Sequence, residues 1–163
     1  MAQLLKDGQL VEDSWQTLAE DSNLQSLPTS GNLLLTLPQW QQLAEQLPHH
    51  SGNIGITLDT DTELEDIPGQ CLELPLIAIA FTKFADGRGF SLARLLRERH
   101  NYRRELRATG DILRDQLYLL KGCGFNSFQL SGIDLAESAA SLQDFSEAYQ
   151  SSVEQPEPLF RRR

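Results

Sequence analysis

The segment NLLLTLPQWQQLAEQL at residues 32–47, followed by NIGITL at 53–58 and LPLIAIAF at 74–81, decides the fold. Short apolar runs alternate with stretches of helical periodicity, and this alternation is typical of strand–helix–strand units. Strand candidates begin near residues 32, 54, 76, 105 and 126, at intervals of 21 to 29 residues. Such intervals accommodate a strand and a crossover helix, which favours a parallel sheet with right-handed connections.

The chain is therefore predicted to be an α/β protein with about five mostly parallel strands and crossover helices. The strands are expected to form either an open three-layer sandwich or a curved half-barrel, and the sequence does not choose between the two. A half-barrel would leave a sheet edge or an inner face to cover, which would favour a homo-oligomer or another partner.

Three parts are predicted, namely an N-terminal hairpin appendage, an α/β domain and a flexible tail, which cover residues 1–31, 32–150 and 151–163. The hairpin is inferred because Leu4-Leu5 and Leu10-Val11 flank the turn sequence Asp7-Gly8. Trp15 and Leu18 are expected to lie on a short helix after it. The tail has no apolar periodicity and ends in three arginines, a composition typical of flexible chain ends.

The charge balance excludes some partners. The 163 residues carry 14 basic and 23 acidic side chains, a net charge of -9 at pH 7, which argues against nonspecific binding to nucleic acid or to an anionic membrane. Neither a long apolar run nor a signal peptide is visible, so a cytoplasmic location is expected. The two cysteines, Cys71 and Cys123, form neither a zinc motif nor a CxxC pair, and no metal site is predicted.

Basic residues are concentrated in one segment. Residues 83–121 contain ten basic and five acidic side chains, a net charge of +5, which leaves -14 for the rest of the chain. This distribution favours an anionic small ligand or an acidic partner surface, and the alternative is a solvated helix face with internal ion pairs. On the helix expected after Ser91, Arg94 and Arg97 are predicted to face outward and to bind a partner, whereas Arg99 falls on the packed stripe.

Ligands of parallel α/β sheets bind where the loops after the carboxyl ends of the strands converge. Here the loop after Phe81 contains Asp86-Gly87-Arg88-Gly89 and leads to a helix that Ser91 is expected to cap. Glycines beside a helix N-terminus suit an oxyanion such as phosphate, sulfate or sulfite. The predicted anion-binding residues are Lys83, Asp86, Gly87, Arg88, Gly89 and Ser91. The alternative is a tight turn in which Asp86 and Arg88 pair with each other or with loop amides.

Proton transfer at this end of the sheet would fall to Asp86 or Asp111, the latter expected to cap the helix after the next strand. No nucleophilic triad and no nucleotide-binding fingerprint is visible. No flavin, nicotinamide, iron–sulfur or heme motif is visible either, so no cofactor is predicted on this chain. The residues alone leave open whether the protein is an enzyme.

A series of motifs within residues 76–130 resembles one bacterial family. The motifs are Phe81-x-x-Phe84-x-Asp86-Gly87-Arg88-Gly89-Phe90-Ser91, Ala93-Arg94-Leu95-Leu96-Arg97, Leu106-Arg107-Ala108-x-Gly110-Asp111, Arg114-Asp115-Gln116 and Cys123-Gly124-Phe125. They resemble the family called domain of unknown function nine-three-four. In that family proline usually stands at the position of Thr82 and tyrosine often at that of Phe90, and a looser likeness extends from Leu5 to Tyr149.

The resemblance implies a role in assimilatory sulfite reduction, because members of the family are commonly described as oxidoreductases involved in sulfite reduction. It implies an accessory protein that acts with a sulfite or nitrite reductase hemoprotein and binds a sulfur oxyanion at the loop Asp86 to Ser91. Any redox cofactor is then expected on the partner. One alternative is a small α/β enzyme in which Arg88 and Lys83 bind an oxyanion-bearing metabolite and Asp86 or Asp111 transfers a proton. A structural subunit is the other.

Overall fold

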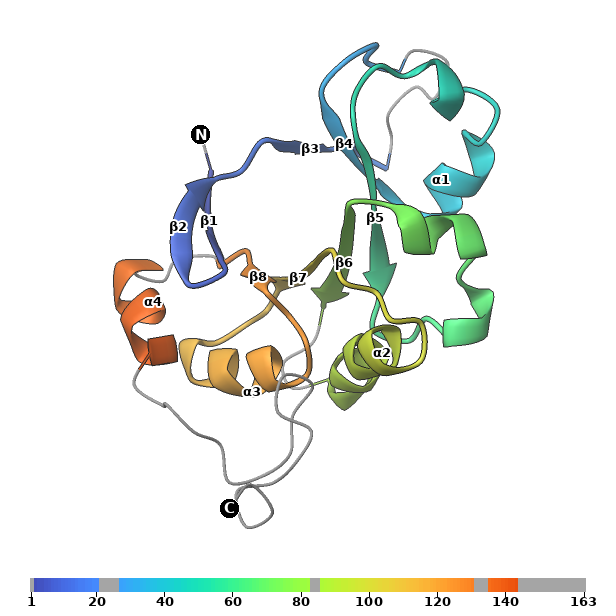
Figure 1. The fold of residues 1–163 in the computed structure, drawn as a ribbon. Coiled ribbons are helices and arrows are strands. Elements are labelled where there is room, and N and C mark those ends of the chain that lie inside the picture. The colour runs from blue at the N-terminus through green and yellow to red at the C-terminus, as the bar shows by residue number, and fades with distance from the viewer. Residues whose placement is uncertain (1, 21–26, 83–85, 131–134, 144–163) are drawn as a thin grey trace.

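The computed structural model describes residues 2–20, 27–82, 86–130 and 135–143. Its centre is a sheet of eight strands (Figure 1). The strands are β1 (Gln3–Lys6), β2 (Gln9–Glu12), β3 (Trp15–Thr17), β4 (Asn32–Thr36), β5 (Ile54–Asp59), β6 (Leu76–Phe81), β7 (Glu105–Gly110) and β8 (Ser127–Phe128). Lys83 and the tail expected at residues 151–163 lie outside the described residues.

Strands β3 to β8 follow one another in chain order and run parallel. The order across the sheet is β2-β1-β8-β7-β6-β5-β4-β3, and β1 is antiparallel to both β8 and β2. The sheet curls into a half-barrel with the helices on its outer side (Figure 1). Of the two predicted architectures, the half-barrel is therefore confirmed.

The strand positions agree with the prediction better than the strand number does. The five expected starts correspond to β4 to β8, which begin at residues 32, 54, 76, 105 and 127. The expectation of about five strands is wrong, because the N-terminal segment adds three to the sheet. Trp15 lies in β3 rather than on a short helix, since its backbone pairs with Asn32 of β4 in parallel register.

The N-terminal hairpin belongs to the same sheet as the parallel strands. Asp7 and Gly8 adopt φ angles of 50° and 79°, the left-handed geometry that a two-residue hairpin turn requires. Leu5 is paired with Phe128 of β8. Leu4 and Leu5 are both fully buried, and because successive strand residues point to opposite faces, β1 is covered on both sides.

A two-residue link joins the two edges of the sheet. β2 ends at Glu12 on one edge and β3 begins at Trp15 on the other. Three Cα–Cα steps reach at most about 11 Å, so the edges must curl toward each other. The link is held by its own contacts, because the Trp15 backbone N–H donates to Asp13 Oδ1 (3.1 Å) and Asn32 Nδ2 donates to Ser14 Oγ (2.9 Å).

Three helices of the described residues lie in connections between strands, and a fourth follows the last strand. They are α1 (Leu37–Gln42), α2 (Gly87–Glu98), α3 (Leu117–Gly122) and α4 (Leu135–Gln143), with 3-10 turns at Leu47–His49, Leu64–Asp66, Gly69–Glu73 and Arg114–Gln116. The main core lies between α2, α3 and the outer face of β6 and β7, where Ile77, Ile79 and Leu106 are fully buried. None of the helices in the described part of the chain combines the length and apolar character needed to cross a membrane.

Helix α2 is rotated relative to the expectation from its leucines. Its buried positions are Gly89, Leu92, Ala93, Leu96 and Arg97, whereas Arg99 is exposed. The prediction that Arg97 faces outward and Arg99 inward is therefore wrong. The cause is Gly89: a Cβ there would lie 2.5 Å from the Phe81 ring, so this glycine faces the sheet and sets the rotation of the helix.

The buried Arg97 guanidinium holds three backbone carbonyls. Nε donates to Gly124 O (2.9 Å), and Nη1 donates to Tyr102 O (2.6 Å) and Arg104 O (2.9 Å). Its carbon atom also lies 5.6 Å from the centre of the Tyr102 ring, which favours a cation–π contact. Arg97 thus fixes the connection between α2 and β7.

Replacing Arg97 with methionine is expected to destabilise the fold by about 3 kcal/mol or more, because buried carbonyls lose a charged donor. Arg99→Met, two positions away and exposed, is the matched control and is expected to change stability by no more than about 0.5 kcal/mol. Urea unfolding of the two variants measures both values. Equal losses would contradict the observed rotation of α2.

Candidate functional site

The predicted anion-binding loop lies at the carboxyl end of the parallel strands. Asp86 caps α2 and accepts the backbone N–H of Arg88 (3.2 Å). The Arg88 side chain reaches back to the same carboxylate, with Nε 3.1 Å from Oδ1 and Nη2 3.0 Å from Oδ2. The Thr60 hydroxyl donates to Oδ2 at 2.6 Å. The structure thus brings Asp86 and Arg88 together as a bidentate ion pair.

This pair restricts what the loop can do chemically. Hydrogen bonds from Arg88 and Thr60 hold the pKa of Asp86 well below its usual range, so this carboxylate is ionised at neutral pH and is a poor proton donor. Asp86 in turn raises the pKa of Arg88, and the charges of Asp61 and Glu63 act in the same direction. An incoming anion would have to compete with all three acidic groups for Arg88.

The other predicted residues of the loop have local structural contacts. Gly89 packs against Phe81, as described above, and nothing lies within 4 Å of the place where a Gly87 Cβ would be. The Ser91 hydroxyl donates to the Gly87 carbonyl (3.4 Å) within the first turn of α2, and Asp86 rather than Ser91 caps the helix. An anion-binding role for these residues stays a prediction.

Asp111, the second candidate for proton transfer, lies just beyond β7. Its side chain is exposed and its backbone N–H donates to Phe81 O (2.7 Å). The expectation that Asp111 caps the next helix is wrong, since Leu113 precedes the 3-10 turn that begins at Arg114. The reason is that Ile112 is buried, which draws the chain toward the core before helical structure begins.

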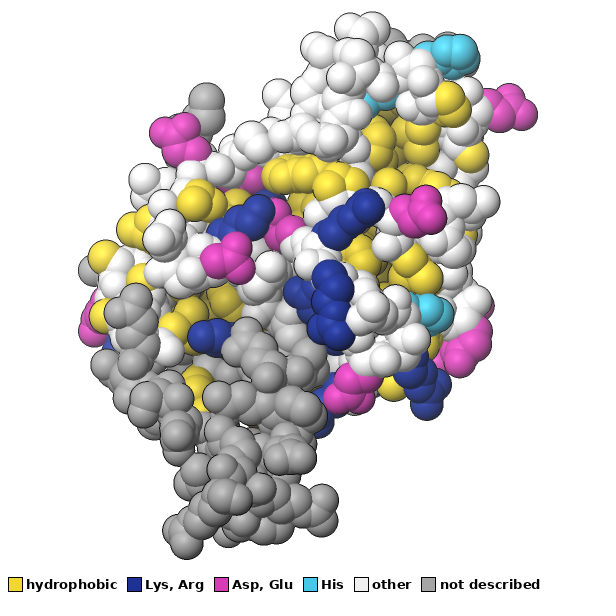
Figure 2. Space-filling view, viewed as in Figure 1, with side chains coloured by type: hydrophobic (Ala, Val, Ile, Leu, Met, Phe, Trp, Pro, Cys, Tyr) yellow, Lys and Arg dark blue, Asp and Glu magenta, His cyan; other side chains and the backbone are white. Residues whose placement is uncertain are grey.

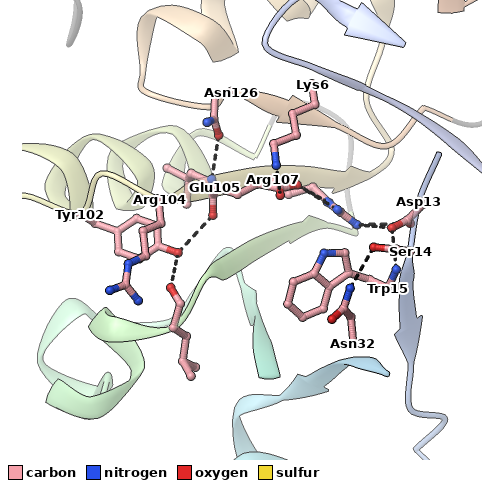
Figure 3. Close-up of polar contacts among 12 residues, drawn as sticks. Lys6, Asp13, Ser14, Trp15, Asn32, Tyr102, Arg104, Glu105, Arg107 and Asn126 are labelled. Atoms are coloured by element: carbon pink, nitrogen blue, oxygen red, sulfur yellow. Dashed lines mark hydrogen bonds and ion pairs between the residues drawn. The ribbon is translucent and has the colours of Figure 1, made fainter. Parts of the chain in front are cut away.

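A charge network that sequence reasoning missed lies toward the amino end of the strands. Lys6 Nζ donates to Glu105 Oε2 (2.8 Å). Arg107 donates to Glu105 Oε1 through Nε (3.1 Å) and Nη2 (2.9 Å), and its Nη1 lies 3.2 Å from both carboxylate oxygens of Asp13. Figure 3 shows these four side chains, here called the inner charge network, joining β1, the link before β3 and β7.

The inner charge network is electrically balanced and, apart from the 38% exposed Lys6 side chain, it is buried. The side chains of Arg107, Asp13 and Glu105 are 2%, 8% and 8% exposed, and two cations face two carboxylates. Burial alone would raise the pKa of Glu105, but the hydrogen bond from Lys6 and the charge of Arg107 outweigh it and lower that pKa. A balanced network of this kind tolerates burial because each charge has a partner.

A sequence signal for this network was present. Glu105 and Arg107 are two positions apart on a strand, which places both on one face. Their register partners on β6 are Leu76 and Ala78, which are fully buried. Two charges on a buried face of an interior strand require counterions, and Lys6 and Asp13 supply them.

Exposed basic residues gather near the same end of the sheet, in the connection between α2 and β7. Arg99, His100, Arg103 and Arg104 are exposed there, and this segment is called the basic loop (residues 99–104). Figure 2 shows Lys and Arg side chains in the middle of the face where Figure 1 draws this connection. Arg94, by contrast, is 40% exposed and pairs with Glu98 at 3.3 Å.

The basic loop is anchored at several points. The Tyr102 hydroxyl hydrogen-bonds to Leu74 O (2.8 Å) and Glu105 O (3.2 Å), and Arg97 holds two of the loop carbonyls. Arg103 Nε donates to Asn101 Oδ1 (2.7 Å). The arginine side chains are therefore presented from a fixed backbone.

The described residues offer little for metal or thiol chemistry. No group of three or more His, Cys, Asp or Glu side chains in the described ranges is arranged to hold a metal ion. Cys71 and Cys123 are free. Burial raises the pKa of Cys71 to about 11 and also raises that of Cys123, so both are protonated thiols at neutral pH.

Comparison with models of protein families identifies a family that matches this chain. A family model described as "Bacterial protein of unknown function (DUF934)" matches residues 55–160. This range includes β5 from its second residue, β6 to β8, the loop Asp86 to Ser91 and the basic loop, and it excludes the N-terminal hairpin. No curated protein matches the chain.

Replacing Arg107 with methionine is expected to destabilise the protein by about 3–5 kcal/mol, because Glu105 and Asp13 would lose their buried counterion. Arg104→Met, an exposed arginine three positions earlier, is the control and is expected to stay within about 0.5 kcal/mol of the wild type. Urea unfolding at pH 7 measures both. An unchanged stability of the Arg107 variant would show that the network contributes nothing to folding.

The network also predicts a dependence of stability on pH. Since the folded-state pKa of Glu105 lies below the ordinary value of 4.5, its contribution is fully present above pH 4.5 and is lost as the pH falls through the folded pKa. The difference in unfolding free energy between wild type and Glu105→Gln should therefore stay constant from pH 7 to 4.5 and narrow as the pH falls below 4.5. A difference that also stays constant below pH 4.5 would contradict this assignment.

Proposed function

We propose a docking function for this chain, which belongs to the bacterial family of unknown function DUF934. In this proposal the protein is an accessory factor of assimilatory sulfite reduction, and it binds a sulfite or nitrite reductase hemoprotein through the basic loop. The partner carries the redox cofactor. The sulfite part of the proposal comes from the family resemblance, and the docking part comes from the arrangement of the arginines.

The docking role rests on one observation: exposed arginines of the basic loop lack ion-pair partners among the described residues, and the backbone that carries them is held in place. Arg99 and Arg104 have no ion-pair partner among the described residues, and Figure 3 draws the Arg104 guanidinium away from the inner charge network. The backbone beneath them is held by Arg97 and Tyr102. Binding through such a loop costs little ordering entropy, which favours a specific complex.

The charge distribution defines the partner surface. The protein as a whole carries a charge of -9, so an acidic partner is repelled by most of its surface and attracted at the basic loop. Exposed acids gather at and after the carboxyl end of β5, namely Asp59, Asp61, Glu63, Glu65 and Asp66. This asymmetry orients an acidic partner toward the amino end of the strands.

The sequence-based expectation changes at Arg97 and at the loop Asp86 to Ser91. Arg97 is buried and cannot contact a partner, although it positions the loop that does. The loop Asp86 to Ser91 has no part in the docking role, and a sulfur oxyanion that binds there would have to displace Asp86 from Arg88.

The double charge reversal Arg103→Glu/Arg104→Glu is expected to weaken reductase binding at least ten-fold, a loss of about 1.4 kcal/mol or more. The physical reason is that two attractive charges become repulsive at the centre of the interface. Biolayer interferometry with the immobilised reductase hemoprotein measures the Kd, and the effect should be larger at low ionic strength.

Two variants serve as controls for this measurement. Arg114→Glu reverses a 44% exposed arginine that follows the carboxyl end of β7, and Arg94→Glu tests the residue expected from the sequence to bind the partner. Both are expected to change the Kd less than three-fold. A wild-type protein that does not bind the reductase would refute the function, and an equal loss in the Arg114 variant would refute the location of the interface.

A further inference from the structure

A pocket of about 300 Å³ opens between the hairpin turn, the ends of α3 and α4, and the start of β8. Its volume lies at the lower end of the range of small-molecule sites, about 300–1,000 Å³. Six of its lining residues carry the argument below: Phe125, Phe128, Leu142, Asp7, Lys121 and Asn126. None of them belongs to the basic loop or to the loop Asp86 to Ser91.

One part of the lining is apolar and rigid. Phe125, Phe128 and Leu142 are 1%, 2% and 6% exposed. The Phe125 ring lies 5.9 Å from that of Phe81 in a tilted arrangement, and Phe128 is fixed by its pairing with Leu5. Only small parts of these side chains reach the pocket, and they offer apolar contacts to an aliphatic or thioether side chain of a ligand without rearrangement of the protein.

The other part of the lining carries one positive and one negative side chain, which do not form an ion pair with each other. Lys121 and Asp7 both line the pocket, yet among the described residues neither side chain has an ion-pair or hydrogen-bond partner. Asn126 uses its Oδ1 to accept the Leu106 backbone N–H (2.8 Å), and Figure 3 shows its amide nitrogen on the side away from that bond. One acceptor and two donors are thus available beside the apolar surface.

We propose that this pocket binds the zwitterion of an apolar α-amino acid. Lys121 and the Asn126 amide N–H bind the carboxylate, Asp7 binds the ammonium group, and the side chain packs on Phe125, Phe128 and Leu142. A plain carboxylate would make no use of the Asp7 charge, and a plain amine would make no use of the Lys121 charge, whereas a zwitterion uses both. The proposal goes beyond the docking function and does not depend on it.

Isothermal titration calorimetry of the full chain with L-leucine and L-methionine tests the proposal. Saturable binding with a stoichiometry of one is expected for at least one of them. The matched analogues 4-methylpentanoate, which lacks the ammonium group, and 3-methylbutylamine, which lacks the carboxylate, should each bind at least ten-fold more weakly than L-leucine. The proposal would be overturned if either analogue bound as tightly as L-leucine, or if neither amino acid showed saturable binding.

Variants place the site within the molecule. Asp7→Asn keeps the size of the side chain and tolerates the left-handed φ of 50° at this position, and Lys121→Gln removes the cation. Each should lower the affinity at least ten-fold. Glu12→Gln, which neutralises an exposed acid of the same hairpin outside the pocket, should leave the affinity unchanged, as should Arg103→Glu/Arg104→Glu. Unchanged binding by Asp7→Asn and Lys121→Gln would show that the ligand binds elsewhere.

Discussion

The shortness of the link between β2 and β3 constrains the whole sheet. These strands lie on opposite edges of the eight-stranded sheet, and only Asp13 and Ser14 separate them in the chain. A link of this length can join the two edges only if the sheet is curled, so the N-terminal segment and the half-barrel depend on each other. Arg107, from a strand between the two edges, holds Asp13 with two contacts of 3.2 Å and so fixes the link to the inner face.

The same constraint explains how the inner face is covered. Consecutive parallel strands in chain order send their connections to one side of the sheet, and the helices therefore cover the outer face. The inner face is covered from the N-terminal segment instead: Trp15 packs against the cluster of Leu34, Leu76 and Ala78, and Asp13 and Lys6 neutralise the charges of β7. The hairpin residues thus share one sheet with the parallel strands and cover its inner face.

Local sequence signals predicted much of this structure, and long-range partners account for the errors. Apolar runs located β4 to β8, and Asp7-Gly8 located the hairpin turn, because both signals depend on neighbouring residues. β3 was missed because its three residues are a strand only through pairing with β4. The rotation of α2 was missed because it depends on contact between Gly89 and Phe81, and the Asp86–Arg88 pair was recognised only as an alternative to an anion site.

The basic segment shows why a charge count from sequence overstates the available surface charge. Arg97 and Arg107 are buried and bind backbone carbonyls or carboxylates, and arginine suits both tasks because its planar guanidinium donates several hydrogen bonds at once. Arg88, Arg94 and Arg114 each face a carboxylate. What remains for a partner among the described arginines is Arg99, Arg103 and Arg104, three side chains on one anchored loop. Among the described arginines of this segment, those without a carboxylate or backbone-carbonyl partner are thus concentrated, at the surface, on one short connection.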